Sequence, residues 1–78
     1  MDPEQNRISQ MVEKELPGHA IVFDDDDKDG NIRFLIKDGS GGVVTRGKPA
    51  FHRGEIRKWS DGDLRALIRF VCGGELSQ

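Results

Sequence analysis

The sequence predicts a small α+β domain in which a helix is followed by three antiparallel strands and a second helix. Apolar residues recur at helical spacing near both ends of the chain, and they alternate with polar residues in between. Glycine-rich and acidic turn sequences separate the strand-like segments. We therefore expect a three-stranded antiparallel sheet, with or without a fourth short strand, covered on one face by the two helices.

Length and composition indicate one soluble domain. A chain of 78 residues leaves room for a single core, which we place in residues 1–74, with residues 75–78 as a flexible C-terminal tail. There is one cysteine, the N-terminal segment lacks the apolar core of a signal peptide, and no apolar run approaches the roughly 18 residues that span a bilayer. These features predict a cytoplasmic protein without a membrane partner.

Charge is distributed unevenly along the chain, although the net charge is only −2. Residues 1–31 carry nine acids and three bases, whereas residues 32–78 carry five acids and nine bases. Such a bipolar chain either neutralises its own surface on folding or offers two faces to differently charged partners. We expect self-neutralisation, because most exposed charges serve solubility.

The first helix is predicted to begin at the amino end, where Asp2 can cap it and Pro3 suits its first turn. Pro17-Gly18 ends it. The apolar stripe of this helix, at positions i, i+3, i+4 and i+8, consists of Ile8, Met11, Val12 and Leu16.

Two strands are predicted at residues 19–25 and 31–37, because apolar β-type residues flank the acidic turn sequence Asp-Asp-Asp-Asp-Lys-Asp-Gly. We expect this turn to pair Asp27 with Asn31, which fixes the register of the hairpin. Under this register the core face carries Val22, Ile32, Phe34 and Ile36, and the opposite face carries Ile21, Phe23 and Leu35.

A further turn is predicted at residues 38–42, followed by a short strand at 43–46. Residues 47–54 are expected to be irregular, because Pro49 disfavours a central strand. Residues 55–58 are expected to form another short extended segment.

The last helix carries strong local signals. Ser60 is a predicted N-cap with Asp63 as its capping-box partner, and Trp59 can pack on Leu64 as a hydrophobic staple. Gly73-Gly74 ends the helix. Its apolar stripe consists of Leu64, Leu67, Ile68 and Val71.

Basic and aromatic residues gather between positions 46 and 59, where bases attract phosphates or carboxylates and aromatic rings stack on unpaired nucleobases. The residues predicted to contact nucleic acid or an acidic partner are Arg46, Lys48, His52, Arg53, Arg57, Lys58 and Trp59. Phe51 is a second candidate for stacking, and Arg65 and Arg69 would extend the patch along the last helix. The alternative is a solvated loop with two core aromatic residues.

Metal, cofactor and catalytic signals are weak. Residues 25–32 resemble the opening of an EF-hand loop, but the twelfth position is Ile36 and not a bidentate glutamate, so we interpret the segment as a solvated hairpin tip. No Cys and His spacing suggests zinc, and the glycine-rich turn lacks the lysine of a P-loop. Cys72 is expected to be a buried filler. We expect no metal, no cofactor, no small-molecule substrate and no catalytic residue.

The order of elements is similar to that of double-stranded-RNA-binding domains and of small mRNA-cleaving toxins. The first family carries a basic cluster at the start of its second helix, where this chain reads Ser60-Asp61-Gly62-Asp63. The second family carries a Gly-Ser-His signature, of which this chain has only Gly18-His19. The main hypothesis is therefore a non-enzymatic domain that binds nucleic acid or an acidic partner. The alternatives are a protein-interaction adaptor or homodimer that uses an apolar sheet face and the acidic hairpin tip, and a ribonuclease toxin with His19 as general base.

Overall fold

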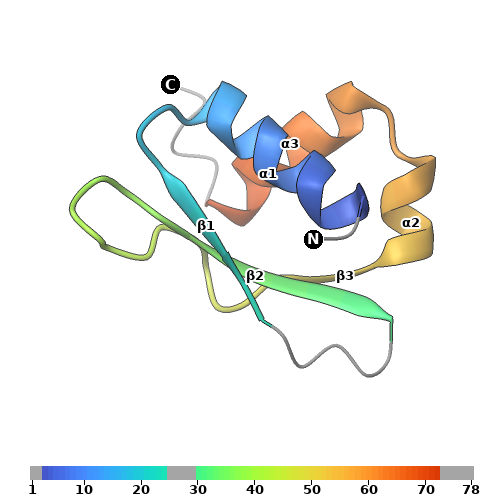
Figure 1. The fold of residues 1–78 in the computed structure, drawn as a ribbon, viewed down its shortest axis with the longest axis horizontal. Helices are drawn as coiled ribbons and strands as arrows, with labels where there is room; N and C mark the ends of the chain where they lie inside the picture. The colour runs from blue at the N-terminus through green and yellow to red at the C-terminus, as the bar shows by residue number, and fades with distance from the viewer. Residues whose placement is uncertain (1–2, 25–29, 73–78) are drawn as a thin grey trace.

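The computed structural model describes residues 3–24 and 30–72, which form an α+β fold. The elements in chain order are α1 (Pro3–Glu15), β1 (Ala20–Phe23), β2 (Asn31–Lys37), β3 (Ala50–His52), α2 (Arg53–Lys58) and α3 (Asp61–Val71). Figure 1 shows α1 and α3 on the same side of the sheet. This arrangement confirms the predicted three-stranded antiparallel sheet with helices packed against it.

The central strand β2 has one fully buried face. The strand order is β1-β2-β3, and both neighbours of β2 run antiparallel to it. Ile32, Phe34 and Ile36 are at most 1% exposed, whereas the residues between them are only half-buried. The alternation therefore directs one side of β2 into the core, as its sequence predicts.

The predicted register of the first hairpin is wrong by one residue. Val22 lies opposite Leu35, and Ile21 lies opposite Ile36. Because the side-chain period of a strand is two, this shift exchanges the two faces of β1. Val22, expected in the core, is 44% exposed, whereas Ile21 and Phe23 pack against the core. The observed register packs the large side chains of Ile21 and Phe23 against the core and leaves the smaller Val22 outside it. The expected pairing partner Asp27 lies outside the described residues.

The third strand lies later in the chain than predicted. In place of a strand at 43–46, the structure has an isolated bridge from Val43 to Lys37, after which the chain leaves the sheet. It returns at Pro49, whose carbonyl accepts a hydrogen bond from the Phe34 amide, and continues as β3. Residues 50–52, expected to be irregular, therefore form a strand. Pro49 is compatible with it because β3 is an edge strand.

Residues 55–58 belong to a helix and not to an extended segment, which corrects the prediction. The His52 Nδ1 accepts a hydrogen bond from the Gly54 amide and caps α2. Ile56 is completely buried among the core residues. Gly54 within α2 disfavours a helical conformation. The burial of Ile56 and the cap by His52 therefore decide that these residues form a helix.

Both longer helices follow their sequence signals. The stripe of α1 is buried, and Ser60 and Asp63 form the predicted capping box of α3. On α3, Leu67 is half-buried, while its other predicted core residues are fully buried. The ring contact of Trp59 is with Phe51, at a centroid distance of 5.6 Å. The predicted cap Asp2, the predicted stop at Gly73-Gly74 and the tail at 75–78 lie outside the described residues.

One arginine ties the three helices together. The guanidinium of Arg7 on α1 donates to the carbonyls of Ile56 and Trp59, at 2.6 and 2.5 Å, and lies 3.2 Å from the Asp61 carboxylate. These carbonyls lie at the C-terminal end of α2, where the Ile56 carbonyl also accepts a hydrogen bond from the Trp59 amide at 3.3 Å. Arg7 therefore fixes the connection between α2 and α3 against α1.

Replacing Arg7→Met should lower the free energy of unfolding by about 1–3 kcal/mol, because two partly buried carbonyls lose a charged donor. Urea denaturation followed by circular dichroism measures the change. Lys14→Met is the matched control, since Lys14 is exposed on the same helix. Equal stability of the two variants would contradict the bridging role of Arg7.

Thr45→Val should leave stability unchanged or raise it by about 1 kcal/mol. Thr45 is 8% exposed, and its hydroxyl has no hydrogen-bond partner in the described part of the chain. A buried hydroxyl without a partner is costly, and a methyl group removes that cost. Urea denaturation of Thr45→Val and of Thr45→Ser, which keeps the hydroxyl, tests this. A marked loss of stability confined to the valine variant would show that the hydroxyl is bonded in solution.

Candidate functional site

The sheet face opposite the helices, hereafter the open face, gathers several candidate binding residues. Strand alternation and the register place on it the side chains that are neither in the core nor under the helices. They are Ala20, Val22 and Asp24 from the first strand segment, Asn31, Arg33, Leu35 and Lys37 from β2, Ala50 and His52 from β3, and Lys48 from the segment before β3.

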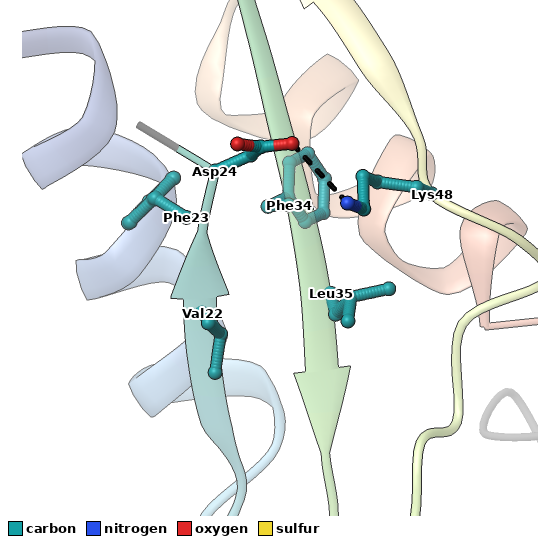
Figure 2. Close-up of a pocket in the computed structure, with 6 residues that line it drawn as sticks. All are labelled: Val22, Phe23, Asp24, Phe34, Leu35 and Lys48. Carbon is teal, nitrogen blue, oxygen red and sulfur yellow. Dashed lines mark hydrogen bonds and ion pairs between the residues drawn. The ribbon is translucent and has the colours of Figure 1, made fainter. Parts of the chain in front are cut away.

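A shallow hollow of about 340 Å³ lies on the open face. Figure 2 shows Lys48 reaching across β2 toward Asp24, with Val22 and Leu35 beside the pair. The Lys48 Nζ is 3.2 Å from the Asp24 Oδ2, and both side chains remain partly exposed. Such an exposed ion pair contributes only about 0–1 kcal/mol, so another carboxylate can take the place of Asp24 at little cost.

Positive charge dominates the open face. Arg33, Lys37 and Lys48 lie there, and Asp24 is the one acidic residue that the described register places with them. The described residues of this face therefore carry a formal charge of about +2, with the histidine counted as neutral. His52 uses its Nδ1 as the acceptor that caps α2, and this role requires an unprotonated Nδ1. Val22 and Leu35 form an apolar strip among these charges.

The aromatic rings point to the helix side of the sheet. Phe23, Phe34, Phe51 and Trp59 form a chain of contacts with centroid distances of 6.3, 6.2 and 5.6 Å. Phe34 is completely buried, and the other rings are half-buried against the core. Phe23 and Phe34 contribute to the lining of the hollow, but among the described residues strand alternation places no aromatic side chain on the open face other than the histidine. This face therefore offers charge and apolar contact more than stacking.

The predicted basic residues do not form one surface. Lys48 and His52 lie on the open face. Arg57 lies on α2, where its guanidinium is 2.9 Å from the buried carboxylate of Glu4 on α1. Lys58 is exposed on α2, and Arg53 is the first residue of that helix. Arg46 is exposed, and its amide donates to the Val71 carbonyl at the end of α3.

The proposed extension of the basic patch along α3 is partly neutralised, because two arginines share one carboxylate. Arg65 and Arg69 both lie 3.2 Å from the Glu15 carboxylate of α1. Conversely, sequence reasoning missed Arg33 and Lys37 as members of a basic surface. Their signal was the alternation of β2, which places both residues opposite the buried side chains.

The turn after β2 is held by one carboxylate. The Asp38 Oδ1 accepts hydrogen bonds from the Ser40 hydroxyl at 2.6 Å and from the amides of Ser40 and Gly42, each at 2.9 Å. These bonds lower the pKa of Asp38 below its ordinary value, the hydroxyl contributing most, and the charge of His19 adds a smaller effect. The hydroxyl of Ser40 is thus used to hold this turn.

Other candidate groups have local structural partners or lie outside the described residues. Cys72 is 4% exposed, and burial raises the pKa of its thiol, so the predicted buried filler is confirmed. His19 approaches the Pro17 carbonyl at 3.4 Å. Residues 3–24 and 30–72 hold no cluster of three side chains fit to bind a metal, and the acidic tip at 25–29 lies outside these ranges. None of the helices in these ranges is long and apolar enough to cross a membrane.

No family model, curated protein or solved structure matches this chain. Functional assignment therefore depends on the geometry of the open face. That geometry combines an apolar strip, a positive charge balance and an ion pair of low cost.

The turn at Asp38 predicts a defined pH dependence. Because the pKa of this carboxyl is lower in the fold than its ordinary value of 3.8, its contribution to stability is present above pH 3.8 and is lost as the pH falls through the lowered value. Asp38→Asn should therefore be less stable than the parent at neutral pH, and the difference should shrink in acid. Urea midpoints measured at decreasing pH test this, with the exposed Glu13→Gln as control. A difference that stays constant down to acid pH would contradict it.

Proposed function

We propose that this domain is a non-enzymatic binding module whose open face holds an acidic segment of a partner protein. The observation that carries this proposal is the charge balance among the described residues of the open face, where three bases and one acid surround an apolar strip whose Val22 is 44% exposed. Acidic side chains of the partner would meet Lys37 and Lys48, and apolar ones would cover Val22 and Leu35. Complementary charge then sets orientation and association rate.

Exchange of ion pairs provides the binding mechanism. In the free domain Lys48 is held by Asp24, so its ammonium is already positioned over β2. A carboxylate of the partner replaces Asp24 at a cost of about 0–1 kcal/mol, because the existing pair is exposed to solvent. Burial of the apolar strip supplies affinity that the exchange of charges alone does not.

The aromatic geometry favours a polypeptide partner over a single-stranded nucleic acid. Sequence-tolerant binding of single strands relies on aromatic side chains that stack with bases. Here the rings of Phe34, Phe51 and Trp59 are engaged with one another on the helix side of the sheet. An apolar strip flanked by bases suits a peptide that mixes acidic and apolar residues.

A fluorescent peptide of alternating glutamate and leucine is a direct probe of the open face. Fluorescence anisotropy should show salt-sensitive binding, and Lys48→Glu should weaken it about tenfold, equivalent to about 1.4 kcal/mol. Lys14→Glu changes the net charge equally but lies on α1, and it should leave the affinity unchanged.

Two results would overturn this proposal. Equal weakening by both variants would show that net charge, and not the open face, controls binding. Salt-sensitive binding of single- or double-stranded RNA or DNA without binding of the peptide would replace the polypeptide partner with nucleic acid. In that case Lys58→Glu reports whether α2, the alternative basic surface, is used.

A further inference from the structure

The outer edge of β1 carries main-chain groups that have no partner among residues 3–24 and 30–72. The Asp24 amide donates to the Arg33 carbonyl, which fixes the hydrogen-bonding phase of the β1–β2 ladder. In an antiparallel ladder, alternate residues of a strand bond to the same neighbour. The amides and carbonyls of Ile21 and Phe23 therefore point away from β2, toward the edge of the sheet.

Short length is the protection against strand pairing that this edge has, since β1 contains four residues. Natural edge strands are blunted by very short length, charges, prolines, bulges or a covering element, and β1 lacks the charges and prolines. The sequence of β1 is Ala-Ile-Val-Phe, without charge or proline. Figure 1 shows β1 in front of β2, and no other described element is drawn across it. Val22, in the middle of the strand, is 44% exposed.

We propose that two copies of this chain associate through β1, in antiparallel orientation, to form a continuous six-stranded sheet. A two-fold axis beside Val22 pairs Ile21 of each copy with Phe23 of the other. This register uses the outward amides and carbonyls of both residues and forms four hydrogen bonds. It also keeps each face of the sheet continuous, because directly paired antiparallel residues lie on the same face.

The side chains of the open face are self-complementary in this register. Val22 meets its own copy, and the apolar strip extends through Leu35 on both sides. Asp24 of one copy lies opposite Ala20 of the other copy. Within that other copy, Ala20 lies opposite Lys37. Two strand spacings, about 10 Å, separate this lysine from Asp24. Lys48 already crosses β2 to Asp24 in the same way.

The two symmetry-related pairs of Lys37 and Asp24 therefore favour a second copy over an unrelated extended segment, and they offset the repulsion between two faces that are each positive in sum. Lys37 has no ion pair within the described part of the chain, and the small side chain of Ala20 leaves its path to Asp24 of the other copy open. The contact involves only four residues of each strand, so we expect a weak dimer that forms with increasing concentration. The dimer uses the main-chain edge of β1, which the acidic partner does not, but it shares Val22, Asp24 and Lys37 with the proposed site on the face.

Sedimentation velocity over micromolar to millimolar concentrations tests the association. The parent protein should shift from monomer to dimer. Val22→Lys should remain monomeric, because it places two like charges at the two-fold axis. Val43→Lys is the matched control, since Val43 is 51% exposed but lies away from β1, and it should dimerise like the parent. Circular dichroism verifies that both variants are folded.

Cysteine cross-linking tests the register. Across a non-hydrogen-bonded antiparallel pair the Cα atoms are about 4.5 Å apart, within the range of a disulfide. Val22→Cys treated with diamide should form a covalent dimer, whereas Val43→Cys should form several-fold less. Cys72 is buried and does not compete.

A parent that sediments as a monomer throughout, a Val22→Lys variant that still dimerises, or equal cross-linking of both cysteine variants would overturn the proposal. Binding of the acidic peptide is measured with the parent protein at micromolar concentration, so failure of the dimer and failure of the peptide site are distinguishable.

Discussion

The buried face of β2 is the constraint on which the rest of this structure depends. Ile32, Phe34 and Ile36 lie between the neighbouring strands and beneath the helices, and each contributes about 1.5–3 kcal/mol by leaving water. Residues that lie directly opposite each other in an antiparallel sheet point to the same face. The two faces of β2 therefore determine which side chains of β1 and β3 enter the core. The helices complete the core because their apolar stripes join this face in one cluster of buried residues.

Polar contacts then divide the molecule into a neutralised helix side and a basic open face. Glu4 and Glu15, both on α1, hold the guanidiniums of α2 and α3. Acidic residues from the first part of the chain thus form ion pairs with basic residues from the second part, in line with the bipolar charge pattern. Arg7 closes the arrangement by binding the end of α2. Among the described residues, what remains positive is the open face, where the Asp24 carboxylate directly after β1 faces bases from β2 and from the segment before β3.

The open face and the free edge of β1 meet at Val22, so the two proposed contacts share an apolar strip without sharing their main-chain groups. A partner on the face would contact side chains, whereas a second copy would bond the backbone edge. Dimerisation would double both the area and the formal charge of the face. The residues that define both surfaces come from β1, β2 and the segment before β3, which are far apart in the sequence and adjacent only in the sheet.

The sequence by itself determined both long helices, the alternation of β2 and the capping box of α3, because these features depend on residues a few positions apart. Tertiary structure alone decided the register of β1, the position of β3 and the helical state of α2. A strand register depends on which pair of side chains fills the core, and α2 depends on the burial of Ile56. The candidate site followed the same division. The sequence identified Lys48 and His52, but only the packed sheet brought them together with Arg33 and Lys37 and removed Arg57, Arg65 and Arg69 into ion pairs.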